Sequence, residues 1–292
     1  MTSPRAGSRG TGRIDLHTHS NASDGTGSPA EVVAAAAAAG LDVVALTDHD
    51  TTAGWDEAAE AARRHGVVLV PGVEISCRAD GITVHLLAYL PDPAHPGLLA
   101  EFDRIRGDRQ RRARLMVERI SADYELTWDD VAAQVAGGAT VGRPHLADAL
   151  VARGHAVDRD EAFRGILASG SPYYVGHYSA DARDVVRLVR DAGGVPVMAH
   201  PFASRRGRVI ADDCVAALAR AGLAGLEADH RDHLPHQRDH ARALAADLGL
   251  VVTGSSDYHG GGKPNAIGEN LTAPDVLASI ERAATGTGVI RP

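Results

Sequence analysis

The chain has 292 residues, of which 44% are hydrophobic, and its formal net charge is -8. This length and apolar content suit one large α/β domain or two ordinary ones. The negative charge argues against a broad grip on duplex nucleic acid but permits a small anionic substrate, because bound cations can reverse the charge within a site. The two cysteines, Cys77 and Cys214, stand far apart outside any CxxC motif, which argues against a disulfide framework and fits a reducing, cytoplasmic location.

Residues 1–13 differ in composition from the rest of the chain. They are rich in Ser, Gly and Arg and contain no apolar run. Such a segment is neither a signal peptide nor a membrane span. We expect a disordered lead-in.

Strand and helix patterns alternate in the first third of the chain. Ser28 is the expected N-cap of the first helix, with Pro29 after it and Glu31 completing a capping box. The continuous apolar run LDVVALTD predicts a strand covered on both faces. A second helix over residues 55–65 leads to the strand VVLVPG, so the order is β, α, β, α, β.

The alternation resumes after residue 180. Helices are expected over residues 181–192, 212–221, 235–248 and 274–284, and they separate the strands VPVMA, GLEA and LVVTG. With ITVHLLAYL, the chain has about seven strands, mostly followed by helices, which predicts a parallel sheet. This pattern alone does not distinguish a closed barrel from an open doubly wound sheet.

The alternation stops between residues 98 and 172. A charged helix over residues 101–122 carries six arginines between positions 104 and 114, and the helical patterns WDDVAAQV, RPHLADALVARG and DRDEAFRGIL follow it. We interpret residues 98–172 as an inserted helical cap over a domain formed by residues 14–97 and 173–292. The arginine run has two readings, a solvated helix face or a track for an RNA backbone.

His17 and His19 form an H-x-H motif that follows the apolar residues at the start of an expected strand. In an extended strand, residues i and i+2 project to the same face, so both imidazoles would point at one centre, which suits a metal ion. Further residues of metal-binding type lie within or just after apolar runs: Asp48, His49, Asp50, Glu74, His85, His200, Asp257 and His259. Because side chains from at least five strands must converge, we expect a closed barrel with its chemistry at the carboxyl ends of the strands.

The order of these motifs resembles a known family. H-x-H, a downstream Asp24, T-D-H-D, P-G-x-E, an internal histidine, A-H-P and S-D-x-H-G together resemble the PHP (polymerase and histidinol phosphatase) metallophosphoesterases, over residues 14–290. The stretches VGRPHLADAL, GLEADHRDH and VTGSSDYHGG are most similar to the bacterial branch that removes 5′- or 3′-phosphates from nucleotides. The resemblance implies a distorted seven-stranded (β/α) TIM-like barrel.

The resemblance also implies two or three divalent metal ions, Mn²⁺, Zn²⁺ or Fe²⁺. One ion would be held by His17, His19 and Asp257, and Glu74 would bridge it to a second. His85 and His200 would complete the second ion's shell, and Asp24, His49 and His259 would hold the third. A carboxylate can bridge two cations whereas an imidazole serves one, which makes a glutamate the expected central residue. One of the two aspartates that flank His49 would orient a ligand.

Arg143 is the main candidate for a substrate contact. It lies in G-R-P-H at a predicted helix start, where backbone N–H groups and a guanidinium can both meet a phosphate. His145 of the same motif is a second candidate. His230 and Arg231 follow the strand GLEA and are expected to reach substrate from the barrel rim. The other histidines of that stretch are interpreted as solvent-exposed: His233, His236 and His240.

The predicted reaction is hydrolysis of a nucleotide phosphate monoester, a nucleoside 5′-monophosphate or 3′,5′-bisphosphate, by a metal-activated hydroxide. Glu74 would bridge the metals, Arg143 would stabilise charge on the phosphoryl oxygens, and His200 or a water would protonate the leaving group. Convincing Ser, Cys or Lys nucleophile motifs are absent from the sequence, which favours water as the attacking group. We expect a small phosphorylated substrate, no membrane and no obligate protein partner.

Other activities stay open at this point. A 5′–3′ exoribonuclease acting on short RNA would use the same residues in an open groove, and histidinol phosphate is a further substrate to consider. A noncatalytic module that supports a polymerase would show eroded ligand positions, which this chain does not. A metal-dependent amidohydrolase usually has a carboxylated lysine, and Lys263, the single lysine, lies outside the strand pattern.

Overall fold

One sheet organises the barrel part of the chain. A computed structural model describes residues 12–135, 141–176 and 178–292. The sheet follows the order β1-β2-β3-β4-β6-β7-β8, and β5 pairs with β3 off this path. Its strands are β1 (Ile14–Asp15), β2 (Val43–Leu46), β3 (Val68–Ala79), β4 (Ile82–Tyr89), β5 (Ala180–Asp181), β6 (Val195–Ala199), β7 (Gly225–Asp229) and β8 (Val251–Gly254). A bridge between Thr18 and Tyr258 joins the two ends of this order. The expected distorted seven-stranded α/β barrel is thereby confirmed, nearly closed.

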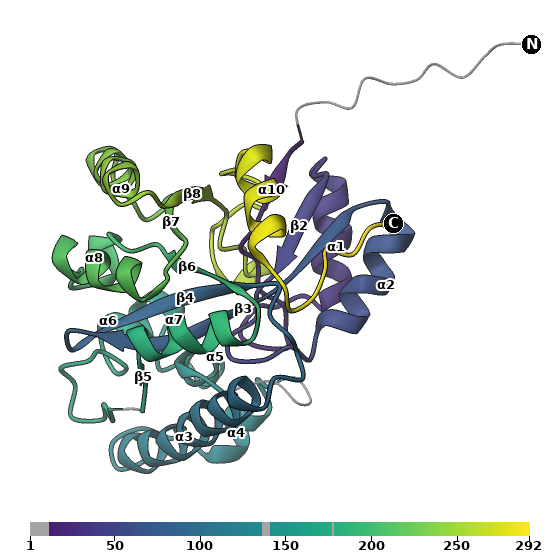
Figure 1. Cartoon of the computed structure of the whole chain (residues 1–292). Helices are drawn as coiled ribbons and strands as arrows, with labels where there is room; N and C mark the ends of the chain where they lie inside the picture. The colour runs from purple at the N-terminus through teal and green to yellow at the C-terminus, as the bar shows by residue number, and fades with distance from the viewer. Residues whose placement is uncertain (1–11, 136–140, 177) are drawn as a thin grey trace, which may run out of the picture.

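Helices cover the outside of this sheet, as Figure 1 shows. They are α1 (Pro29–Ala38), α2 (Trp55–His65), α7 (Ala182–Asp191), α8 (Asp212–Ala221), α9 (Pro235–Leu248) and α10 (Pro274–Ala283). The capping box predicted for α1 is present, because the Ser28 hydroxyl accepts from the backbone N–H of Glu31 and the Glu31 carboxylate accepts from that of Ser28. Helix α2 has its predicted bounds, so local sequence signals determine these elements.

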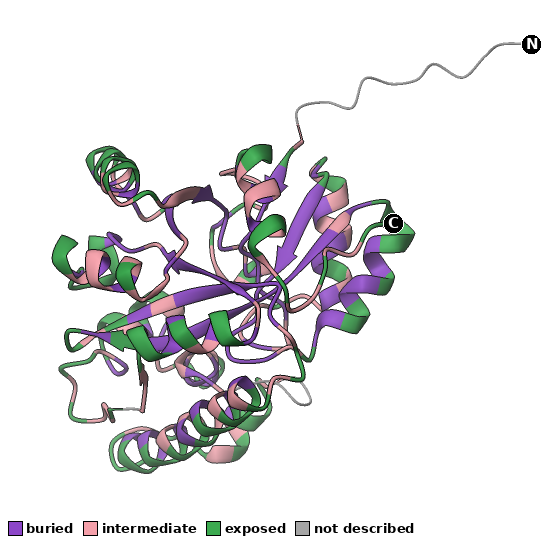
Figure 2. Ribbon diagram, in the orientation of Figure 1, coloured by how far each residue is buried: buried purple, intermediate pink, exposed green. Residues whose placement is uncertain are grey.

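Strand β2 is buried on both faces, as its continuous apolar sequence predicts. Val44 and Leu46 pack under the covering helices, whereas Val43 and Ala45 pack in the cluster inside the barrel. Tyr89 lies in this inner cluster and donates a hydrogen bond from its hydroxyl to the carbonyl of Leu16. Figure 2 shows most of the strands as buried and the outer helix faces as exposed, with parts of β4, β5 and β8 intermediate.

Strand β4 contradicts the expected all-parallel arrangement. It pairs antiparallel with both neighbours, β3 and β6. Strands β3 and β4 form a hairpin whose turn contains Asp80 and Gly81, both with positive φ, so no helix separates them. As a result Glu74 lies in the middle of the 12-residue strand β3 instead of at its end.

The helical insertion has its own apolar core. It contains α3 (Pro96–Ile120), α4 (Trp128–Ala132), α5 (Arg143–Ala152) and α6 (Arg159–Arg164). Buried side chains such as Met116, Leu146 and Leu150 form a cluster separate from those of the barrel. Helix α3 begins earlier than predicted, at Pro96, because the His95 side chain caps it. In Figure 1, α3 and α4 lie at the foot of the view, away from α8, α9 and α10.

The predicted disordered lead-in, residues 1–13, falls outside the described residues except for its last two positions. Within the part of the chain that the structure describes, no helix combines the length and apolarity needed to cross a bilayer.

Candidate metal centre

Nine side chains from six strand regions meet inside the barrel mouth. Their backbone positions follow β1, β2, β6 and β8 or lie within β3 and β4. We call them the histidine–carboxylate cluster: His17, His19, Asp24, His49, Glu74, His85, His200, Asp257 and His259. The structure thus brings together every residue that the sequence analysis put forward as a metal ligand.

Glu74 is at the centre of this cluster and is almost fully buried. Each of its two carboxylate oxygens faces imidazole nitrogens. Oε2 lies 3.2 Å from His17 Nε2, 3.1 Å from His19 Nε2 and 3.3 Å from His49 Nε2. Oε1 lies 2.8 Å from His85 Nδ1 and 3.3 Å from His200 Nε2. A carboxylate surrounded in this way can bridge two cations.

The cluster divides into three overlapping groups whose ligand atoms lie within 4.8 Å of one another. They are His17, His19, Glu74 and Asp257; His19, Asp24, His49 and His259; and His49, Glu74 and His85. The first group contains the residues expected around the first ion. His49 joins Glu74 and His85 where His200 was expected, and His200 reaches the cluster through its 3.3 Å contact with Glu74.

These residues fit divalent cations. Nδ1 of His19 and of His49 are buried without a hydrogen-bond partner among the described residues. Nδ1 of His85 and Nε2 of His259 also make no hydrogen bond there, although carboxylate oxygens of Glu74 and Asp24 lie 2.8 and 3.2 Å from them. His17 Nε2 and His19 Nε2 lie only 3.0 Å apart. Two ring nitrogens bound to one zinc ion at about 2.0–2.1 Å come within about 4.2 Å of each other, so this approach suits a shared ion. The donors are nitrogen and oxygen, which Mn²⁺, Zn²⁺ and Fe²⁺ all accept.

Glu227, on β7, contacts two residues of the cluster, His17 and His200, and was not identified in the sequence analysis. It is fully buried and accepts a hydrogen bond from His17 Nδ1 at 3.0 Å and from the backbone N–H of His200 at 2.8 Å. The Ser255 hydroxyl also donates to it. The first bond fixes the tautomer of His17 so that Nε2 faces Glu74. The available signal was the acidic residue inside the apolar strand GLEA.

Two cations beside Asp257 were also missed. Asp257 directs Oδ1 toward His17 and His19, whereas Oδ2 accepts hydrogen bonds from Arg206 Nη2 at 2.5 Å and Lys263 Nζ at 3.0 Å. Arg206 follows β6 and Lys263 follows β8. Positive side chains at the edge of a metal cluster favour an anionic substrate.

Burial and charge set the protonation of the cluster. Burial lowers the pKa of His200 to about 3, and Arg206 acts in the same direction. Burial likewise lowers the pKa of His259 to about 4, helped by Lys263. Burial alone would raise the pKa of Glu74, but the surrounding histidines hold it well below its usual range. For His200 and His259 these directions give neutral imidazoles, and for Glu74 an ionised carboxylate, the forms that bind metal. His17 differs, because the carboxylates of Glu74, Glu227 and Asp257 outweigh its burial and hold its pKa well above the usual range.

The backbone is strained at this site. His200, with φ of 30°, and Asp257, with φ of 54°, adopt a left-handed conformation that residues other than glycine seldom take. Asp50, beside His49, has φ of 54°. Such conformations persist where the surrounding structure enforces them, and they are commonest at functional sites.

The two aspartates that flank His49 hold neighbouring loops. Asp48 accepts hydrogen bonds from Ser20 and Ser23, in the loop that carries Asp24. Asp50 accepts from the backbone N–H of Ser76 at 2.9 Å. Within the described residues neither carboxylate bonds to a histidine of the cluster.

The expected substrate residues lie in different surroundings. Arg143 begins α5 and its guanidinium lies 5.2 Å from the Phe163 ring centroid. His230 is fully buried, and its Nε2 lies 3.4 Å from Asp257 Oδ2, the oxygen that also contacts Arg206 and Lys263. Arg231 is exposed and bonded to Glu269.

The remaining histidines after β7 differ from one another. His233 is buried, which contradicts the expected solvent exposure: its Nδ1 contacts the carbonyl of Ala228 at 2.8 Å, and its Nε2 accepts from the N–H of Phe202. His236 and His240 are exposed, as expected.

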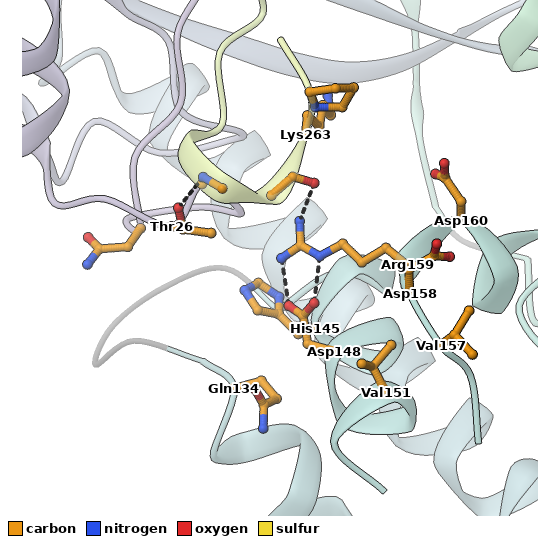
Figure 3. Close-up of a pocket in the computed structure, with 15 residues that line it drawn as sticks. Thr26, Gln134, His145, Asp148, Val151, Val157, Asp158, Arg159, Asp160 and Lys263 are labelled. Atoms are coloured by element: carbon orange, nitrogen blue, oxygen red, sulfur yellow. Dashed lines mark hydrogen bonds and ion pairs between the residues drawn. The ribbon is translucent and has the colours of Figure 1, made fainter. Parts of the chain in front are cut away.

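A groove of about 720 Å³ opens between the barrel loops and the helical insertion, with His145 and Lys263 in its wall. Figure 3 shows Arg159 of α6 extending across it. The Arg159 guanidinium donates two hydrogen bonds of 2.6 Å to Asp148 and one of 3.3 Å to the carbonyl of Gly262. Polar groups converge in this groove, as in a site for a small ligand.

The barrel and its centre belong to the class of metal-dependent phosphoesterases, and comparisons with known proteins agree. The PHP domain model matches residues 15–126. The chain is 36% identical over 288 residues to the 3′,5′-nucleoside bisphosphate phosphatase of Chromobacterium violaceum, covering 96% of this chain and 98% of that protein. It is 32% identical to the 5′-3′ exoribonuclease of Haemophilus influenzae, covering 92% and 98%.

A solved structure from Bifidobacterium adolescentis, assigned as a metal-dependent phosphoesterase, has a TM-score of 0.91 and 44% identity, covering 93% of this chain and 96% of its own. The chain therefore belongs to the PHP family and is a metal-dependent phosphoesterase. The expected family and enzyme class are confirmed.

Proposed function

We propose that this enzyme hydrolyses a phosphate monoester of a nucleotide, either a nucleoside 5′-monophosphate or a nucleoside 3′,5′-bisphosphate. The observation that carries this proposal is the Glu74 carboxylate with five imidazoles around it at the barrel mouth. The phosphatase from Chromobacterium violaceum, similar over nearly the whole chain, supports the substrate class.

Two or three divalent ions would be held by the histidine–carboxylate cluster, with Glu74 between them. When bound, such ions lower the pKa of water and offset charge on the phosphoryl oxygens. Glu227 keeps the ring of His17 in its ligand orientation. Arg206 and Lys263, which contact Asp257, provide positive charge for an incoming phosphate. His200 Nε2 lies 3.3 Å from Glu74 Oε1 and 2.9 Å from Arg206 Nη1, and burial lowers the pKa of the ring to about 3, which favours its neutral form.

We further propose that residues 98–172 form a cap over a barrel domain built from residues 14–97 and 173–292. The separate apolar core formed by the second half of α3 with α4 to α6 supports this division, whereas Leu98, Phe102 and Ile105 in the first half of α3 pack with the barrel core. The bond from Arg159 to Gly262 ties α6 to the loop after β8. Because Arg159 crosses the groove, the groove suits a mononucleotide better than a continuous RNA chain.

A 5′–3′ exoribonuclease is the second candidate. The Haemophilus influenzae relative of that description supports it, as does the groove of about 720 Å³ lined by residues of α5, α6 and the loop after β8. The same cluster can act on a phosphodiester, so the two activities must be distinguished by assays with both kinds of substrate.

Phosphate release under Mn²⁺ tests the proposal. The substrates are adenosine 5′-monophosphate, adenosine 3′,5′-bisphosphate, histidinol phosphate and a 5′-phosphorylated adenosine dinucleotide, the last followed by mononucleotide release. We expect turnover of one or both adenosine phosphates, with histidinol phosphate at least about tenfold slower in kcat/KM, a difference of roughly 1.4 kcal/mol. Faster cleavage of the dinucleotide would favour the exoribonuclease, and an inactive but folded, metal-loaded protein would refute both activities.

A further inference from the structure

The two ends of the sheet order meet without a strand ladder. In the described part of the chain, β1 and β8 are the terminal strands of this order, and one isolated bridge, between Thr18 and Tyr258, joins the segments that follow them. The backbone N–H of His19 also donates to the carbonyl of Tyr258 at 2.8 Å. We call this meeting of β1 and β8 the barrel seam. Buried backbone groups at the barrel seam need partners other than a ladder.

Regular strand pairing positions several residues of the histidine–carboxylate cluster. His49 bridges to Glu74, which lies in the β3–β4 ladder together with His85. His17 and Asp257, by contrast, face each other across the barrel seam, with His17 Nε2 3.6 Å from Asp257 Oδ1. The separation of these two side chains therefore depends on the contacts that fix the barrel seam.

The carboxylate of Asp15 spans the barrel seam. This side chain is fully buried. Its Oδ1 accepts hydrogen bonds from the backbone N–H of His17 at 3.3 Å and from that of Ser256 at 3.0 Å, and its Oδ2 accepts from that of Gly268 at 2.8 Å. Hydrogen bonds to an ionised acceptor are roughly twice as strong as neutral ones. One carboxylate thus holds the backbone on both sides of the barrel seam.

Ser256 is held through both of its backbone groups. Its N–H donates to Asp15, and its carbonyl accepts a 2.6 Å hydrogen bond from Nδ2 of the buried Asn265. The next residue, Asp257, has φ of 54°, a conformation that persists in residues other than glycine only where the surroundings enforce it. The two bonds to Ser256 provide this support and fix the backbone from which the Asp257 side chain extends.

Asp15 acts on the cluster indirectly. It belongs to none of the three ligand groups found among the described residues. Both of its oxygens already accept from backbone N–H groups. Its contacts therefore reach the ligands through the chain of His17 and through that of Ser256.

We propose that Asp15 is a positioning residue of the metal centre. By holding the backbone of His17 and of Ser256, its carboxylate sets the distance between His17 and Asp257, which belong to one ligand group. This inference rests on the metal centre of the proposed function and adds to it a residue that is not itself a ligand. Glu227 orients one ring, whereas Asp15 fixes two backbone segments, so the loss of Asp15 should affect one ion more than the others.

Calorimetric titration of chelator-treated protein with Mn²⁺ tests this role. In Asp15→Asn, the amide offers one acceptor oxygen instead of two, so at least one of the three backbone N–H groups loses its partner. We expect one class of Mn²⁺ site to weaken about 10–100-fold, the usual effect of losing a residue that supports a ligand, with the remaining sites within about threefold. Asp42→Asn is the control and should match wild type, because Asp42 accepts from the backbone N–H of Arg13, before β1 begins.

The absorption spectrum of the Co²⁺-loaded protein separates positioning from stability. The visible bands of Co²⁺ depend on the geometry of its ligands. Asp15→Asn should shift or weaken these bands at a temperature where circular dichroism shows both proteins to be folded, whereas Asp42→Asn should not. A lower Tm with an unchanged spectrum and an unchanged Mn²⁺ titration would make Asp15 a purely structural residue and overturn the proposal.

Asn265→Ala covers the case in which Asp15→Asn fails to fold. It removes the bond to the Ser256 carbonyl while Asp15 stays in place, so we expect a loss of about 3–10-fold at the same class of Mn²⁺ site. Asn270→Ala is the matched control, since Asn270 Nδ2 bonds the carbonyl of Ser255 at 3.3 Å, one residue further from Asp257. Equal losses at all sites, or none, would contradict a role in spacing His17 and Asp257.

Failure of this inference can be told from failure of the proposed function. If the wild type binds Mn²⁺ but releases no phosphate from any nucleotide, the proposed function fails, and the titrations still decide the role of Asp15. If the wild type binds no Mn²⁺, the metal centre is refuted together with its positioning residue.

Discussion

The position of Glu74 requires a carboxylate, because five imidazole nitrogens approach its two oxygens. Glu74→Gln keeps the size but removes the charge and one acceptor. We expect activity to fall at least about 10³-fold and the metal content to drop, since an amide does not bridge cations as a carboxylate does. Metal analysis and phosphate release measure both effects. Glu60→Gln, at an exposed position of α2, should match wild type, and a Glu74→Gln enzyme of near-normal activity would disprove the central role.

Glu227 acts through His17. Glu227→Gln would weaken the hydrogen bond to His17 Nδ1 without changing the volume of the side chain in the barrel interior. We expect about 10–100-fold weaker metal binding, the usual effect of losing such a partner, and partial recovery of activity at high Mn²⁺. Titration of activity against Mn²⁺ measures this change. A loss of kcat that added metal does not reduce, with unchanged affinity for Mn²⁺, would argue against a positioning role.

The side chains that meet in the histidine–carboxylate cluster could be predicted from sequence, whereas the residues that contact them from neighbouring strands were not predicted. His17, His19 and His200 follow apolar runs, so their residue type and position can be recognised in the sequence alone. Glu227 and Arg206 act only because β7 and the segment after β6 carry them to the cluster. No local pattern encodes that encounter, which depends on tertiary packing.

At the scale of elements, the helices were the most predictable part. Capping residues, proline and glycine fix their ends locally, as at α1 and α2. Strand direction was less accessible, because the apolar run of β4 reads the same in a parallel or an antiparallel strand. The short turn at Asp80 and Gly81 was the available clue, since a parallel connection needs a longer crossover.

Arg159 connects two elements across the groove. Arg159→Gln would remove the paired bonds to Asp148 and the link to Gly262. We expect KM to rise about 3–10-fold, a loss of roughly 0.7–1.4 kcal/mol for a partly exposed contact, with kcat within about twofold. Hydrogen exchange should increase in residues 157–164 and 260–264. Arg153→Gln, whose partners lie away from the groove, is the control, and unchanged KM with unchanged exchange would exclude a tie between cap and barrel.

At the scale of the whole molecule, metal binding should stabilise the fold. Ions that bind only the native state add about 2.7 kcal/mol at a concentration 100 times Kd. Dialysis against a chelator should therefore lower Tm by several degrees, and Mn²⁺ should restore it. Differential scanning calorimetry with and without chelator measures the shift. In Glu74→Gln the shift should shrink, and a wild-type Tm indifferent to chelation would contradict a centre built on these nine residues.

The bridge between Thr18 and Tyr258 has a consequence for synthesis of the enzyme. A nascent chain can pair β3 with β4 early, because that hairpin is local, and this pairing brings His85 Nδ1 within 2.8 Å of Glu74 Oε1. His17 and His19 must wait until Asp257 and His259 have left the ribosome, since the two ends of the barrel order meet only there. Assembly of all nine cluster residues is thus confined to the final moments of translation or later, and a chain terminated shortly before β8 would leave His17 and His19 without Asp257 and His259.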